Sequence, residues 1–236
     1  MNPSPARILV TRSEPGAAQT AARLAAAGYR PICEPLFFIR PIDVVIPDFD
    51  ALAFTSLNGV RRFAELSARR DAPVLCVGAR TADAARQAGF SDVTSADGDV
   101  SALRDLVLAR LPAGARLLHA GNQDARGDLA GQLTMKGIAA GFIALFRAEP
   151  VMRPGRDLAR HLAGDKAFDA ALIHSPRAGI VLADLIRKSA AAAPVDIAAM
   201  SAAAAAPLSG LARRIAIAST PDESALLETL ASLQTD

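Results

Sequence analysis

The chain has 236 residues, of which 51% are hydrophobic and 21% are charged, and its formal net charge is +2. This length suits two small domains, and the apolar fraction is enough for a sizeable core. A net charge this small, without a basic run, argues against a nucleic-acid partner. No apolar run approaches the length of a membrane span, so we expect a cytoplasmic protein without a secretion signal or a membrane partner.

Predicted strands and helices alternate along the whole chain. Short apolar runs predict strands at 7–10, 30–34, 51–54, 74–78, 92–96, 117–121, 140–146, 197–201 and 215–218, and one more that ends in Ile173-His174-Ser175. Nearly every strand is followed by a helical pattern, and capping residues or glycines mark several of the helix ends. This alternation is typical of an α/β fold with parallel sheets.

The segment from Asp50 to Val60 shows most clearly how such a unit could bind a ligand. Its apolar residues 51–54 predict a buried strand, and Thr55, Ser56 and Asn58 follow directly before a helix. In open α/β sheets, ligands bind at the carboxyl ends of the strands, where hydroxyls and free helix amides meet. An ordinary capped turn explains the same residues without a ligand.

The pattern occurs twice in the chain. Residues 169–177 repeat it 119 positions after residue 50, while residues 73–89 match 194–210 at an offset of 121. An earlier block, from Arg7 to Pro41, repeats at a constant offset of 109. Constant offsets that persist through loops indicate an internal duplication.

Two extended, proline-bounded segments occupy matching places in the two copies, and we interpret them as linkers at 35–41 and 145–152. The chain then leaves one domain and later returns to it. We therefore predict a continuous lobe at 42–144 and a discontinuous lobe formed by 1–34 and 153–236. The expected architecture is two doubly wound parallel-sheet lobes, joined by a two-stranded linker and separated by a cleft.

Five short motifs, in this order, resemble the uroporphyrinogen-III synthase family: Val10-Thr11-Arg12, Phe54-Thr55-Ser56-Leu57-Asn58-Gly59-Val60, Val77-Gly78-Ala79-Arg80-Thr81-Ala82, Ile173-His174-Ser175-Pro176 and Ala218-Ser219-Thr220-Pro221-Asp222. The resemblance spans almost the whole chain. It implies a lyase that closes the linear tetrapyrrole hydroxymethylbilane to uroporphyrinogen III, inverting the last pyrrole ring with loss of water and without a cofactor. The reaction belongs to haem and porphyrin biosynthesis.

We expect the substrate's carboxylates to bind to hydroxyls, helix amino ends and arginines. The residues predicted to bind substrate are Thr11, Arg12, Thr55, Ser56, Asn58, Gly78, Thr81, Gly121, Phe146, His174, Ser175 and Ser201. For each of them, a cap or turn role is the alternative. Phe146 stands where the family has a tyrosine thought to assist departure of the substrate hydroxyl.

No single catalytic group is identified, because the main task is to orient a reactive cation. The three histidines lack metal-ligand spacing, and no nucleotide-binding motif follows a strand, so neither a metal nor a cofactor is expected. The alternative function is a two-lobed binding protein that closes on an anionic small molecule without chemistry. We expect a monomer that makes transient contact with hydroxymethylbilane synthase.

Overall fold

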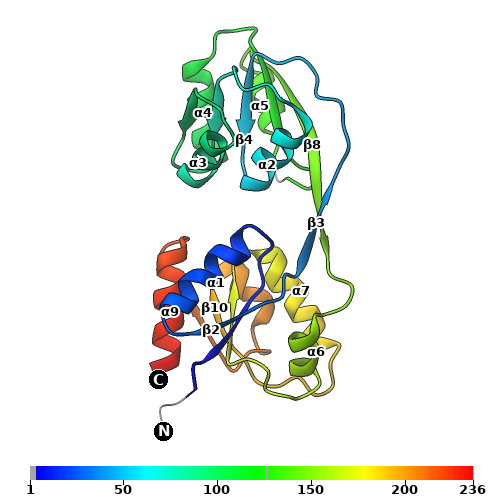
Figure 1. Cartoon of the computed structure of the whole chain (residues 1–236), viewed down its shortest axis with the longest axis vertical. Coiled ribbons are helices and arrows are strands. Elements are labelled where there is room, and N and C mark those ends of the chain that lie inside the picture. Colours follow the sequence, from blue (N-terminus) through cyan, green and yellow to red (C-terminus); the bar gives the residue numbers. More distant parts are fainter. Residues whose placement is uncertain (1–3, 126, 236) are drawn as a thin grey trace. The chain divides into compact units, whose positions relative to one another are not determined.

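The computed structural model describes residues 4–125 and 127–235. The chain divides into two compact units: unit 1 comprises residues 1–38 and 149–236, and unit 2 comprises residues 39–148. Each unit is built on its own sheet, whose strands are parallel except for the edge strand β3 (Phe37–Pro41) of unit 2, and helices cover the sheet (Figure 1). None of the helices within the described ranges is long and apolar enough to cross a membrane.

Unit 1 contains a five-stranded sheet in the order β11-β10-β9-β1-β2. Its elements are β1 (Arg7–Val10), α1 (Gly16–Ala26), β2 (Arg30–Cys33), α6 (Arg156–Leu162), β9 (Ala170–Ile173), α7 (Pro176–Arg187), β10 (Asp196–Ala199), α8 (Ala202–Ala205), the 3₁₀ helix η1 (Ala206–Leu208), β11 (Arg214–Ile217) and α9 (Glu223–Thr235). Strand β2 follows β1 on one side of the sheet, whereas β10 and β11 follow β9 on the other side. The switch point of this doubly wound sheet therefore lies between β1 and β9.

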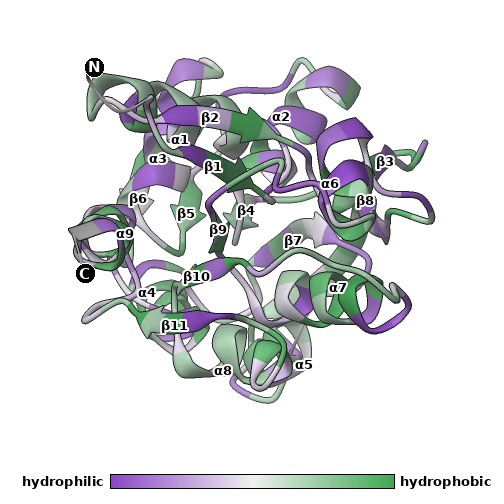
Figure 2. Ribbon diagram, turned by 90° about the horizontal axis from the view of Figure 1, so that it is seen from below, coloured by the Kyte–Doolittle hydropathy of each residue, from purple (hydrophilic) through white to green (hydrophobic). Residues whose placement is uncertain are grey.

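The strands of unit 1 are buried on both faces because successive side chains point to opposite sides of the sheet. Ile8 and Val10 pack with apolar residues of α1 and α9. Leu9 instead joins the cluster formed with α7 and α8. Figure 1 shows α1 and α9 together on one side of this sheet, and Figure 2 shows β9 in the hydrophobic colour.

Unit 2 contains strands in the order β3-β8-β7-β4-β5-β6. Its elements are β4 (Ala51–Phe54), α2 (Leu57–Leu66), β5 (Val74–Cys76), α3 (Ala79–Gln87), β6 (Val93–Ser95), α4 (Val100–Arg110), β7 (Arg116–Asn122), α5 (Leu129–Thr134) and β8 (Ala139–Pro150), with β3 (Phe37–Pro41) at the edge. Helices α2 and α3 pack on one face of the sheet, and α4 and α5 pack on the other. The switch point here lies between β7 and β4.

The two sheets have the same topology, with strands of the two sequence copies exchanged between them. Unit 1 takes two strands from the first copy and three from the second. Unit 2 takes β4, β5 and β6 from the first copy and β7 and β8 from the second, with β3 of the first copy added at its edge. The registers agree, because Ile8 pairs with Ala170 and Leu117 pairs with Ala51. The duplication inferred from the constant offsets thus has a direct structural counterpart.

The chain passes between the units within β3 and β8, which are neighbours in the sheet order. The expected linker at 35–41 contains β3. The expected linker at 145–152 lies mostly inside β8, which begins at Ala139 and is therefore much longer than a tether. Residues 139–146 belong to the sheet of unit 2, as their pairing with β7 shows.

Candidate active site

At the switch point of unit 1, Thr11 connects the two central strands. Its hydroxyl donates a 2.7 Å hydrogen bond to the carbonyl oxygen of Leu172 in β9, and the residue is only 1% exposed. The same turn carries Arg12, while His174 and Ser175 follow the end of β9. The structure therefore brings four of the predicted residues to one edge of the sheet.

Arg12 and His174 meet at a carboxylate that the sequence analysis did not single out. Arg12 Nη1 lies 2.9 Å from Glu223 Oε2, and His174 Nε2 lies 3.4 Å from the same oxygen. Thr20, which is fully buried, donates its hydroxyl to Glu223 Oε1. Burial alone would raise the pKa of Glu223, but the hydrogen bonds from His174 and Thr20 and the charge of Arg12 outweigh it and lower the pKa to about 2.

Serine caps open the helices at two strand ends of unit 1. Ser175 Oγ accepts a 3.2 Å hydrogen bond from the backbone N–H of Ala178, at the start of α7. Ser201 Oγ accepts one of 3.3 Å from Ala204 at the start of α8. Both predicted residues thus lie at carboxyl ends of strands, and both hydroxyls act as caps.

The switch point of unit 2 joins Thr55 to a buried histidine. Thr55 Oγ1 lies 3.4 Å from His119 Nε2, so β4 and β7 are linked through side chains. Burial lowers the pKa of His119 to about 4, which keeps its ring neutral at physiological pH. A Cβ added at Gly121 would lie 3.8 Å from Thr55 Oγ1 and 3.7 Å from His119 Nε2, so Gly121 belongs to the same group.

The other predicted residues of unit 2 lie at two neighbouring helix starts. Ser56 caps α2 by accepting a 3.2 Å hydrogen bond from the N–H of Gly59, and Asn58 is partly exposed in the first turn. Gly78 is the cap residue of α3, with open space where a Cβ would be. Thr81 is 6% exposed on the inner side of α3, so its hydroxyl lies behind the edge rather than on it.

Phe146 is buried in the core of unit 2. It is 3% exposed and belongs to the apolar cluster of unit 2 that includes Phe54 and Phe63. The ring therefore has almost no exposed surface in this structure, and its contact with the substrate stays a prediction. An aromatic residue near a linker looks the same in the sequence whether it lines a site or fills a core, and here the strand continues to Pro150 and carries the ring inward.

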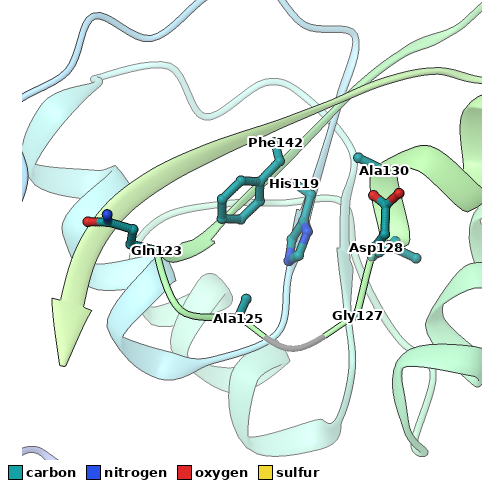
Figure 3. A pocket seen from close by; sticks show the side chains of 8 residues that line it. His119, Gln123, Ala125, Gly127, Asp128, Ala130 and Phe142 are labelled. Atoms are coloured by element: carbon teal, nitrogen blue, oxygen red, sulfur yellow. The ribbon is translucent and has the colours of Figure 1, made fainter.

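One pocket of unit 2 opens beside the switch point. It has a volume of about 240 Å³ and is lined by His119, Phe142 and residues of the loop that leads into α5. Figure 3 shows the rings of His119 and Phe142 close together, with Gln123 and Asp128 on either side of them. The two ring centroids are 5.1 Å apart, and Phe142 is 44% exposed. The pocket therefore offers an aromatic wall next to a neutral imidazole.

Sequence reasoning missed Glu223, Phe142 and the role of His119. The sequence analysis considered His119 only for metal-ligand spacing, which it lacks. Glu223 directly follows the Ala218–Asp222 motif, so its position after a strand was the one available signal. No cluster of three or more metal-ligating side chains occurs among the residues that the structure describes.

Two doubly wound sheets, each with hydroxyls and helix starts at its switch point, define a two-unit α/β protein. In folds of this class, ligands bind at the carboxyl ends of the strands. The chain belongs to the uroporphyrinogen-III synthase family, because the family model described as "Uroporphyrinogen-III synthase HemD" matches residues 18–228. It is accordingly an enzyme of the lyase class, with a role in tetrapyrrole biosynthesis.

Solved structures with the same fold carry the same family name. The uroporphyrinogen-III synthetase of Helicobacter pylori is 14% identical, with a TM-score of 0.59 over 97% of this chain and 99% of that one. A mutant uroporphyrinogen III synthase of Thermus thermophilus is 19% identical, with a TM-score of 0.52 over 98% and 100% of the two chains. At these identities the likeness concerns the fold. A search of curated proteins found no match.

Proposed function

We propose that this chain converts hydroxymethylbilane to uroporphyrinogen III and that residues at the carboxyl ends of strands in both units bind the substrate. The observation that carries the proposal is the matched pair of switch points in a chain of this family. Both switch points place hydroxyls and helix starts next to central strands. The comparisons give no support to a binding protein without chemistry.

The reaction balances without an oxidant or a reductant. The nitrogen of the first pyrrole ring pushes out the hydroxyl of the hydroxymethyl group, which leaves a cation at that carbon. The last ring attacks through its substituted carbon, and the resulting spiro intermediate rearranges and closes with its last ring inverted. One proton is lost from that ring, so the net change is loss of one water, and we propose that no cofactor takes part.

Binding is distributed over many modest contacts. The substrate's carboxylates suit the guanidinium of Arg12 and the amino ends of α2 and α7, where free amides and the helix dipole favour anions. Residues proposed to contact substrate are Arg12, Thr55, Ser56, Asn58, Gly78, Gly121, Ser175 and Ser201. Thr11, Thr81 and His174 lie behind them and support their positions.

The pocket of unit 2 suits a different part of the substrate. The exposed face of Phe142 can stack on a pyrrole ring, and neutral His119 can hydrogen-bond without adding charge. We propose that a pyrrole ring, rather than a carboxylate, occupies this pocket. The main catalytic contribution is then orientation of the reacting carbons.

We further propose that the chain acts as a monomer in the cytoplasm, in transient contact with hydroxymethylbilane synthase. The support is chemical. Hydroxymethylbilane loses its hydroxyl readily, so direct transfer from the enzyme that makes it limits side reactions.

The test is turnover of hydroxymethylbilane by the purified chain, with the isomers of the macrocycle separated by chromatography. We expect uroporphyrinogen III as the product. Formation of only the isomer without ring inversion, at the rate seen without protein, would refute the proposed function. Binding of the bilane without faster cyclisation would favour the two-lobed binding protein.

A further inference from the structure

The cluster of Arg12, Thr20, His174 and Glu223 has a geometry that holds the arginine still. The side chain of Arg12 is 22% exposed and that of Glu223 is 10% exposed, and their polar atoms are 2.9 Å apart. Arg12 Nη1 also lies 3.5 Å from the hydroxyl of Thr20. The Arg12 side chain is thus partly exposed, while a largely buried carboxylate holds one of its nitrogens.

The path of the Arg12 side chain depends on a glycine. A Cβ added at Gly16 would lie 2.3 Å from Arg12 Nε and 2.7 Å from Nη2, which no side-chain packing allows. Gly16 is buried at the start of α1, and its backbone conformation does not itself require glycine. The absence of a side chain there creates the space in which the guanidinium lies.

The fold does not require this charged cluster, because unit 2 has the same fold without it. The positions equivalent to Arg12, His174 and Glu223 are Gly121, Thr55 and Val100. None of these three residues carries a charge, although unit 2 has the same strand order and register. The cluster is therefore an addition at the ligand end of unit 1.

We propose that Glu223 is a positioning residue that orients Arg12 to bind one carboxylate of the tetrapyrrole substrate. A guanidinium presents donors along more than one edge, so a carboxylate on one edge can fix the orientation of another. Glu223 itself repels the anionic substrate and acts only through Arg12. The inference rests on the proposed function, because it names one contact within that site.

The first experiment compares Glu223→Ala with Glu223→Gln in steady-state turnover of hydroxymethylbilane. The alanine variant leaves Arg12 unheld, so we expect KM to rise about tenfold with kcat kept within about twofold, as for loss of one charge-assisted contact. The glutamine variant can still accept hydrogen bonds from Arg12, so its KM should stay near that of the wild type. A rescue of this kind separates positioning from a requirement for negative charge.

A second variant moves Arg12 while every charge is kept. Gly16→Ala should raise KM to a similar extent, since the new Cβ displaces the guanidinium. If Glu223→Ala does not fold, Gly16→Ala tests the position of Arg12 in its place. The matched control is Asp169→Asn, which removes a carboxylate paired with Arg7 at the opposite edge of the same sheet and should leave KM unchanged.

The outcomes are distinct. An unchanged KM in Glu223→Ala and Gly16→Ala would overturn the inference, and so would a lower KM, which would mean that Glu223 competes with the substrate for Arg12. An equal rise of KM in Asp169→Asn would show that the effect comes from a general loss of stability. Absence of turnover in the wild type would instead refute the proposed function.

Discussion

Phe146 fills a core position, which sets the expected effect of adding a hydroxyl there. Phe146→Tyr should lower the free energy of unfolding by about 1–3 kcal/mol, because a buried hydroxyl without a partner loses its hydration. The melting temperature should fall by several degrees without a gain in kcat. Phe142→Tyr on the same strand is the control for stability, since the ring of Phe142 is 44% exposed. A faster Phe146→Tyr enzyme of normal stability would show that position 146 does reach the substrate.

His119 couples the stability of the protein to pH. Its pKa is about 4 in the folded state against an ordinary value of 6.5, so the unfolded chain binds more protons between these limits. Above about pH 6.5, His119 therefore has no effect on the free energy of unfolding. As the pH drops towards 4, its titration lowers that free energy. Between pH 7.5 and 5 the loss from this residue should be about 2 kcal/mol.

Urea unfolding of the wild type and of His119→Gln at these two pH values checks the prediction. The variant should lose less stability on acidification, because its side chain does not titrate. The slope that remains includes His161, whose pKa burial also lowers. An identical loss in both proteins would show that His119 is solvated in the folded state.

At the scale of the elements, the helix caps connect the two copies. Ser56 and Ser175 have nearly the same backbone angles, with φ of −158° and −154°, and each accepts an N–H from the residue three positions on. Gly78 and Ser201 likewise occupy equivalent cap positions, with φ of −156° and −161°. Both copies thus begin helices with the same cap geometry directly after a strand.

The cap positions give a correspondence between the copies that differs by two residues from the offset of 121 found for this segment. Because Gly78 matches Ser201, Thr81 matches Ala204, so the second copy has an alanine in place of this threonine. Both side chains are buried. The replacement therefore changes the packing behind the strand ends and removes no exposed hydroxyl.

The amino ends of the strands show the same repetition in a purely structural role. The backbone N–H of Arg7 donates a 2.8 Å hydrogen bond to the carboxylate of Asp169, and that of Arg116 donates one of 2.9 Å to Asp50. These aspartates pin neighbouring strands at the edge opposite the ligand end. Charge at this edge thus serves the sheet, whereas the charged cluster of Arg12, His174 and Glu223 at the other edge has uncharged equivalents in unit 2.

For the molecule as a whole, local patterns predicted the elements well. Apolar runs such as Ala51–Phe54 identified buried strands, since a strand covered on both faces has no polar alternation. Constant offsets indicated the duplication, and the matched proline-bounded segments predicted two lobes with a returning chain. Such features depend on residues near in sequence or on repetition, and both are visible without a structure.

The contacts that form the site were harder to predict. Arg12 and Glu223 are 211 residues apart, and nothing in the separate copies relates them, because their equivalents Gly121 and Val100 are uncharged. The burial of Phe146 depends on how far β8 extends. Long-range pairing and strand length follow from tertiary packing, which a single sequence does not record.

The exchange of strands between the copies leads to the last prediction, which concerns fragments. Residues 39–148 form a continuous unit with apolar clusters on both faces of its sheet. Expressed alone, this fragment should unfold cooperatively in urea. Residues 1–114 make up the first sequence copy, ending at the turn of Gly114, and should not, because β1 and β2 then lack β9 while β4 lacks β7. Circular dichroism during the titration reads out both fragments. A folded 1–114 beside an unfolded 39–148 would mean that each copy forms its own sheet, and that the exchange does not hold in solution.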